Sequence, residues 1–292
     1  MVYLLAIGSA VLYGAADFTG GLTARRASVI SVVVLSQAGG LALVALVIPL
    51  LPPTAPSPRD LWWGATAGVT GGIGVALLYR ALAVGTMAVV APTAAVCAVA
   101  IPLGVSVLVG ERPAPLALAG IALGIVSIVL VSQQHTPTAP EPADRTGSPR
   151  PSHARSPGIG MAVAAGVAVG VFFLSLARTG SEAGIWPLLV ARLVSVPLFA
   201  AVVIAGGRSL RMPARVAALA VVCGVMDMLA NALYMLAARQ GPLGIVVTLS
   251  SLYPASTVLL ARAVLGERLN PWQATGVGCA LAAVVLIVDG GR

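Results

Sequence analysis

Long apolar runs separated by short polar connections form the dominant pattern of this 292-residue chain. A helix that spans a bilayer needs about 20 apolar residues, and ten runs of roughly that length are present. The first five are Val2–Leu22, Ser28–Leu51, Trp62–Ala83, Met87–Val109 and Ala114–Ser132. The second five are Gly158–Ala177, Gly184–Gly206, Ala214–Ala237, Leu243–Val264 and Trp272–Asp289. The pattern predicts an all-α integral membrane protein with ten transmembrane helices.

The sequence also repeats, with an offset of 156 residues. Residues 109–112 read Val-Gly-Glu-Arg and close the fourth run, while residues 265–268 read Leu-Gly-Glu-Arg and close the ninth. Gly14 and Gly170 share this offset. Because each copy holds five runs, an odd number, the second copy must enter the membrane from the opposite face. We therefore expect two inverted five-helix repeats.

Three segments follow from this repeat. Residues 1–132 form the first five-helix unit, residues 158–292 form the second, and residues 133–157 join them. The joining segment is rich in Pro, Ser and charge, so it cannot bury enough apolar surface to order itself and is expected to be a flexible linker. Both histidines lie in this linker, which argues against an intramembrane proton relay through histidine.

Composition fits a chain whose solvent is lipid. Hydrophobic residues make up 59% and charged residues 9%, whereas soluble domains carry about 25% charge. The net charge is +8, but the basic residues are scattered arginines without aromatic interleaving, so no nucleic-acid partner is expected. The three cysteines are far apart and show no metal or disulfide spacing, and no cofactor is expected. The expected partners are the bilayer and a small-molecule substrate, with the protein a monomer or homodimer.

These features resemble the EamA-type carriers of the drug/metabolite transporter superfamily. The resemblance rests on the ten runs in two halves, on Gly-Glu-Arg after the fourth and ninth runs, and on Tyr13–Gly21, which reads YGAADFTGG. It implies a secondary transporter that exports or exchanges small metabolites or drugs by alternating access, with proton coupling as one option. It also implies a substrate cavity among spans 1, 3, 4, 6, 8 and 9, with spans 5 and 10 at the periphery.

Two other classes of membrane protein compete with a carrier. A channel or passive facilitator is the alternative, and electrical conductance would distinguish it. A membrane enzyme is less expected, because the runs contain no histidine and no nucleophile or metal-binding motif. The absence of lysine beside abundant Ala, Val, Gly and Pro suggests a GC-rich bacterial genome, so the expected location is a bacterial plasma membrane.

Three charged residues lie well inside the apolar runs: Asp17, Arg192 and Asp227. A charge at the bilayer centre costs at least about 2.5–3.5 kcal/mol, so each needs a structural or functional reason. Let face X be the membrane face that holds both chain ends, and face Y the other. Arg192 lies roughly 12 Å and Asp227 roughly 10 Å from face X, so the two can pair. Asp17 lies nearer face Y and is not expected to pair with Arg192.

The eighth run carries a polar stripe. Gly224, Asp227, Asn231 and Tyr234 follow helical spacing and share one face. The stripe either lines a substrate cavity or supports a structural Arg192–Asp227 pair, and the two interpretations are compatible. For Asp17, beside Tyr13, the alternatives are a substrate or proton-coupling role and a structural hydrogen bond to another helix.

Gate and hinge candidates come from the ends and interruptions of the fourth and ninth runs. Glu111 and Glu267 end these runs on opposite faces and serve either as interfacial architecture or as gate contacts. Pro92 and Pro102 interrupt the fourth run and Pro254 the ninth. Breaks in corresponding spans are a known pointer to a transport site, although proline is also common in membrane helices.

Arginine is distributed unequally between the two faces. Eleven arginines lie near face Y and five near face X. The positive-inside rule therefore favours face Y in the cytoplasm, with both chain ends outside. The resemblance to EamA-type carriers implies cytoplasmic ends instead, and the two expectations conflict.

Overall fold

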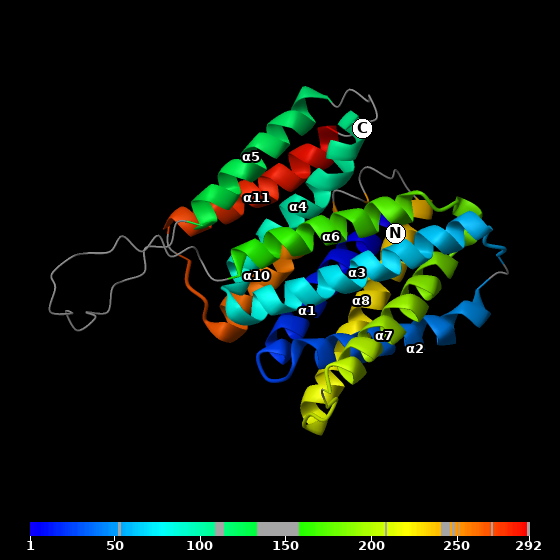
Figure 1. Cartoon of the computed structure of the whole chain (residues 1–292). Coiled ribbons are helices and arrows are strands. Elements are labelled where there is room, and N and C mark those ends of the chain that lie inside the picture. The colour runs from blue at the N-terminus through cyan, green and yellow to red at the C-terminus, as the bar shows by residue number, and fades with distance from the viewer. Residues whose placement is uncertain are drawn as a thin grey trace, which may run out of the picture.

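The computed structural model describes residues 1–290 except 52–53, 109–113, 133–157, 208, 241–245, 247–248, 251 and 270. The described part is helical and contains no strand (Figure 1). Its α-helices are α1 (Val2–Ala24), α2 (Val29–Val47), α3 (Pro58–Val84), α4 (Met87–Leu108), α5 (Pro115–Ser132), α6 (Ile159–Ala177), α7 (Trp186–Ala205), α8 (Ala214–Gln240), α10 (Tyr253–Leu265) and α11 (Pro271–Gly290). Two short 3-10 helices, Ile48–Leu50 and Ser181–Ala183, precede α3 and α7. The all-α prediction is confirmed, and the predicted linker lies outside the described residues.

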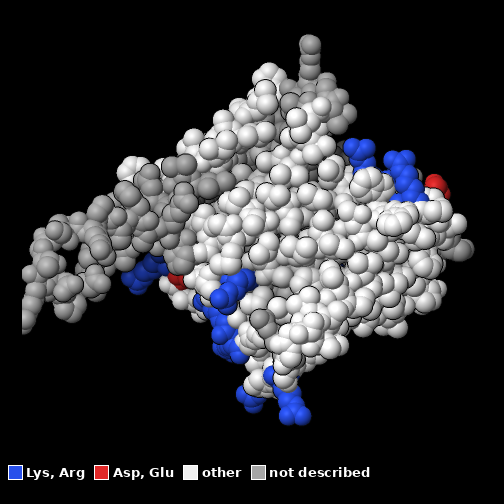
Figure 2. All heavy atoms as spheres, viewed as in Figure 1, with Lys and Arg blue, Asp and Glu red and all other residues white. Residues whose placement is uncertain are grey.

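Six of the described helices are long and apolar enough to cross a bilayer: α1, α2 with the 3-10 turn that follows it, α3, α6, α7 and α8. Shorter apolar segments lie in α4, α5, α10 and α11. The structure therefore describes a multi-pass membrane protein, while the count of ten spans stays a prediction. Figure 2 shows charged side chains near the two ends of the helices, with a broad uncharged surface between them. Such a surface suits the hydrocarbon core of a bilayer.

Local signals set some of the helix ends. Ser57 caps α3, with its side chain accepting a hydrogen bond from the Asp60 backbone N–H while the Asp60 carboxylate accepts from the Ser57 backbone N–H. This reciprocal capping satisfies two N–H groups that the first helical turn leaves free. Pro58 occupies the first helical position, where its missing N–H has no cost. At the other end of the chain, Gly266 terminates α10 with a φ of 64°, a conformation that glycine adopts readily.

The two halves pack reciprocally. The helix α1 packs on α8 as α6 packs on α3, and α2 packs on α8 as α7 packs on α3. The equivalent helices α2 and α7 contact each other, and so do α5 and α11. Figure 1 shows α5 and α11 side by side at one edge of the molecule, which agrees with the expected peripheral position of the fifth and tenth spans. Equivalent helix pairs in the two halves thus make equivalent contacts, as expected when a pseudo-two-fold axis relates the halves.

Glycines at equivalent positions make equivalent close contacts. A Cβ on Gly14 of α1 would overlap Ser256 and the backbone of Tyr253 in α10. A Cβ on Gly170 of α6 would lie 2.6 Å from the Ile101 side chain in α4 and 2.9 Å from the Ala98 carbonyl oxygen. The shared offset of these glycines therefore reflects a shared packing role, because only a residue without a side chain allows both helix pairs to approach so closely.

The opposite orientation of the halves can be traced through two contacts. At face X, the Asp60 carboxylate at the start of α3 accepts a hydrogen bond from Gly180 N, which follows α6, at 2.7 Å. The helix α6 therefore ends at the face where its equivalent, α1, begins. At face Y, Glu267 follows the end of α10 and bonds to Met87 and Ala88 at the start of α4. Equivalent helices thus run in opposite directions, as expected for inverted repeats.

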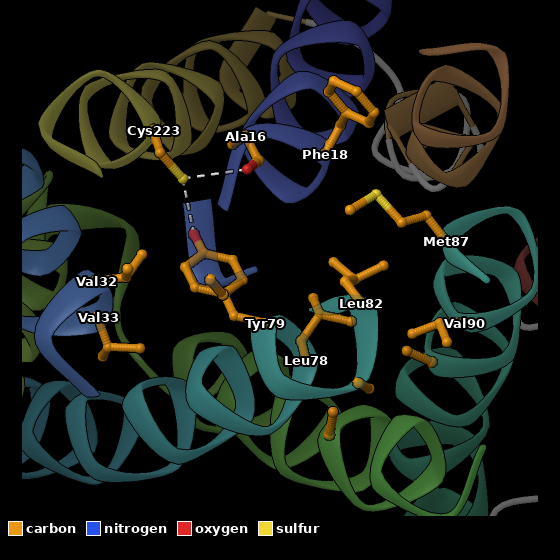
Figure 3. Packing of buried hydrophobic residues seen from close by; sticks show 14 of the residues in the cluster. Ala16, Phe18, Val32, Val33, Leu78, Tyr79, Leu82, Met87, Val90 and Cys223 are labelled. Carbon is orange, nitrogen blue, oxygen red and sulfur yellow. Dashed lines mark hydrogen bonds between the residues drawn. The ribbon is translucent and has the colours of Figure 1, made fainter. Parts of the chain in front are cut away.

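The central core joins α1, α3 and α8 (Figure 3). The Tyr79 hydroxyl and the Cys223 thiol lie 2.9 Å apart, and the thiol also donates to the Ala16 carbonyl oxygen at 3.1 Å. The Tyr79 ring occupies the space that a side chain at Gly20 would need. These contacts fix three helices around one buried aromatic ring and satisfy its polar tip.

The expected proline breaks need a correction. The helix α4 runs without interruption from Met87 to Leu108, so Pro92 and Pro102 do not break it. Neighbouring helices and local adjustments can satisfy the carbonyl groups that an internal proline frees. The ninth span does restart near its proline, because α10 begins at Tyr253 with Pro254 in its first turn and Leu252 lies outside the helix. Of the fourth and ninth spans, only the ninth therefore has a helix start at its proline.

Candidate functional site

A buried polar cluster joins α2, α7 and α8. Arg192 of α7 donates through Nη2 to Asp227 Oδ2 of α8 and through Nη1 to Gln37 Oε1 of α2. Ser195, one turn after Arg192, donates to the same Gln37 oxygen at 2.9 Å. The predicted pairing of Arg192 with Asp227 is confirmed, and we call these four residues and Asn231 the polar cluster.

The polar stripe of α8 faces other helices. Asn231 is 4% exposed, and its amide donates to the Asp227 backbone oxygen at 2.8 Å and to Oδ2 at 3.5 Å. Gly224 lies directly against the backbone of Ser36 in α2. Tyr234 packs against a small apolar cluster that includes Ala6 of α1. The stripe therefore points into the protein, as its helical spacing predicted.

The guanidinium of Arg192 has five N–H donors, and two of its three nitrogen atoms donate to Gln37 and Asp227. Its Nε atom, however, is buried without a hydrogen-bond partner. A Cβ at Gly40 would lie 3.2 Å from this atom, so α2 packs closely against it. The arrangement holds one fixed cation at the junction of three helices, with Asp227 as its counter-charge.

Asp17 and Tyr13 lie one turn apart on α1 and contrast with the polar cluster. Within the described part of the chain, the Asp17 carboxylate makes no hydrogen bond or ion pair, so the structural hydrogen bond considered from sequence is not found. The Tyr13 hydroxyl is buried without a partner, and its ring lies 5.9 Å from that of Tyr253. Asp17 does not pair with Arg192, as expected.

Glu267 forms a second charged contact, at face Y. Its Oε1 accepts from Met87 N at 3.1 Å and its Oε2 from Ala88 N at 3.0 Å. The carboxylate therefore caps the N-terminus of α4, where free N–H groups and the helix dipole favour a negative charge. Arg25, which follows α1, lies 3.5 Å from Glu267 Oε1. Glu111, the equivalent acid, lies outside the described residues.

Arg25 extends this face Y contact to α3. Its Nη2 donates to the Leu82 and Gly85 carbonyl oxygens, each at 3.2 Å, at the end of that helix. A cation there complements the negative end of the α3 dipole. Together Arg25 and Glu267 join α1, α3 and α4 of the first half to the end of α10 of the second.

Sequence reasoning missed Gln37, Ser195 and the Tyr79–Cys223 contact. Gln37 carries a usable signal, because it is the one amide side chain in α2. Ser195 lies three residues after Arg192 and so shares its helix face. For Cys223 the apolar surroundings suggested simple packing, and nothing along the chain indicates the tyrosine hydroxyl opposite it.

The inverted helical halves and the charges buried between them define a multi-pass membrane protein of transporter type. The model of the EamA-like transporter family matches residues 156–289. The family model thus covers most of the second half of the chain, and the resemblance drawn from the sequence is confirmed there. The family consists of transporters rather than enzymes.

Comparison with whole chains adds the fold. No curated protein matches this chain. A solved structure titled "Crystal structure of protein" matches with a TM-score of 0.61 and 18% identity, covering 98% of this chain and 95% of that one. At this identity the match shows the fold alone, and it extends the shared fold across both halves.

Proposed function

We propose that this protein is a secondary transporter that exports or exchanges small metabolites or drugs by alternating access. The observation that carries the proposal is the polar cluster, in which Gln37 of the first half meets Arg192 and Asp227 of the inverted second half. Inverted-repeat carriers place substrate and coupling sites at the interface between repeats, near the middle of the bilayer. A charged contact at this interface has a large desolvation cost, which favours a functional reason for it.

Movement of one half against the other must change the contacts that join them. The polar cluster ties α2 to α7 and α8, and Glu267 ties the end of α10 to α4. Both contacts are formed in this structure. We assign the Glu267 contact to a gate at face Y, which opens when α10 leaves the start of α4. Tyr234 and Asn231 continue the polar surface of α8 from Asp227 toward face X.

Asp17 is the candidate for the coupling group. It is a carboxylate within a membrane helix, and in the described structure it has no ion-pair partner to hold its charge. Binding a proton removes a charge whose burial is costly. A cycle in which Asp17 takes up a proton on one side and releases it on the other would couple substrate movement to the proton gradient.

Transport in proteoliposomes tests the proposal. The purified protein is reconstituted and screened by counterflow against a panel of metabolites and drugs, with and without a proton gradient. We expect counterflow of at least one compound and its accumulation when the gradient is imposed. Asp17→Asn should keep counterflow and lose gradient-driven accumulation, while the exposed acid Glu182 gives the matched control Glu182→Gln. Steady conductance in planar bilayers, with no counterflow, would instead support a channel.

A further inference from the structure

A groove lies away from the polar cluster, where the start of α2 meets the end of α3. It has a volume of about 460 Å³. Residues 27–30 form one wall, and Ala76, Leu77 and Arg80 form the other. Apart from Ser28 and Arg80, the side chains that line it are apolar. The groove thus combines an apolar interior with a single cation.

The cation is available to a ligand. Arg80 is exposed, and neither ion pair in the described part of the chain involves it. It lies four residues before the end of α3, or about 6 Å along the axis. The next turn of α3 meets Arg25 through Leu82 and Gly85 at face Y. Arg80 is therefore at the level of the lipid headgroups of that leaflet.

The groove continues an apolar stripe on the outer surface of α3. Val69 and Ile73 are 38% and 43% exposed. By helical spacing, Leu77 and Arg80 lie on the same face of α3. The rise from residue 69 to residue 80 is about 16 Å, which is about half of a hydrocarbon core of about 30 Å. One acyl chain has the length to follow this stripe while its headgroup reaches Arg80.

We propose that this groove binds an anionic phospholipid of the face Y leaflet, with the phosphate on Arg80 and one acyl chain along α3. Charge complementarity selects the anionic headgroup, because the groove offers a cation and no acid. The repeat supplies a contrast. Tyr79 corresponds to Tyr234, so Arg80 corresponds to Met235, which is uncharged. The equivalent residue on the face X side is thus uncharged, and we assign the lipid site to the face Y leaflet.

Native mass spectrometry of the purified full-length protein in detergent tests this site. Phosphatidylglycerol and phosphatidylcholine with identical acyl chains are titrated separately, and inorganic phosphate forms a third arm. We expect phosphatidylglycerol to bind more tightly than phosphatidylcholine. Arg80→Gln should weaken phosphatidylglycerol binding about fivefold, which is the contribution of one basic residue at an anionic surface. Arg262→Gln is the matched control, because Arg262 is exposed near the same face and lies outside the groove.

A second variant tests the acyl chain. Ala76→Phe fills the groove and leaves Arg80 in place, so it should weaken both phospholipids. Equal binding of the two lipids by the unmodified protein would overturn the proposal, as would equal losses in Arg80→Gln and Arg262→Gln. Arg80-dependent binding of inorganic phosphate as tight as that of the lipid would reduce the site to a simple anion site. Because Arg80 is exposed, Arg80→Gln should fold normally, and elution as a single species checks this.

Discussion

Replacing Asp227 with Asn should destabilise the protein, because the change leaves the buried charge of Arg192 without its partner. The Arg192 side chain is 11% exposed and the Asp227 side chain 23%. Asn keeps the shape of the side chain but leaves the guanidinium without its counter-charge. Breaking a buried ion pair from one side costs about 3–5 kcal/mol. The partial exposure of Asp227 and the remaining bond to Gln37 place the expected loss near the lower end, at about 3 kcal/mol.

Removing both charges should be less harmful than removing one. In the double variant Arg192→Gln with Asp227→Asn, no unpaired charge remains, and the two amides can bond to each other and to Gln37. Replacement of a whole buried pair by neutral groups is often close to neutral. We expect the double variant to lie within about 1 kcal/mol of the unmodified protein, so that the two changes are coupled by about 2 kcal/mol or more.

The measurement is the melting temperature in detergent, defined as the temperature at which heating halves the height of the monodisperse elution peak. Counterflow activity is measured on the same variants. Glu182→Gln serves as a control, because changes of an exposed charge alter stability by about 0.5 kcal/mol or less. A double variant as unstable as the sum of the single changes would refute the reasoning. Normal stability of Asp227→Asn with lost transport would instead assign Asp227 to substrate or proton binding alone.

Three other changes test separate parts of the structure. Gly14→Ala should lower stability by about 1–3 kcal/mol, because the added methyl group overlaps α10. Gly160→Ala is the control, because a Cβ there meets no neighbouring atom. Equal melting temperatures of the two variants would contradict this packing. Glu267→Gln removes the negative cap of α4 and should cost about 1–2 kcal/mol, and an unchanged melting temperature would argue against that contact. A C-terminal reporter active only in the cytoplasm should stay silent if the arginine count sets the orientation, and a positive signal would reverse the assignment.

The apolar pattern predicted most helix positions well, and its errors have physical causes. The helix α3 begins at Pro58, four residues before the predicted start, because its first turn is the polar capping box of Ser57 and Asp60. The helix α8 continues to Gln240, three residues past the predicted end. A count of apolar residues detects the part of a helix that lipid contacts. It does not detect polar turns that project beyond the hydrocarbon core.

The polar cluster was predicted in part. The depths of Arg192 and Asp227 followed from helix rise alone, because each residue could be counted from the end of its own run. Gln37 was not predicted, since helical spacing gives the face of a residue but not the neighbouring helix. The same limit applies to Glu267, whose capping of α4 depends on the approach of α10 to a helix almost 180 residues earlier in the chain.

The position of the cluster explains why its charges occur in one half only. Arg192 corresponds in the repeat to Ser36, and its side chain bonds to Gln37, the residue next to Ser36. The equivalent helices α2 and α7 thus meet near the pseudo-two-fold axis. A symmetric sequence would bring two guanidinium groups together there, in a region of low dielectric where like charges repel strongly. With Arg192 on α7 and the neutral amide of Gln37 on α2, this repulsion does not arise. The symmetric fold therefore requires different residues in its two halves at the axis.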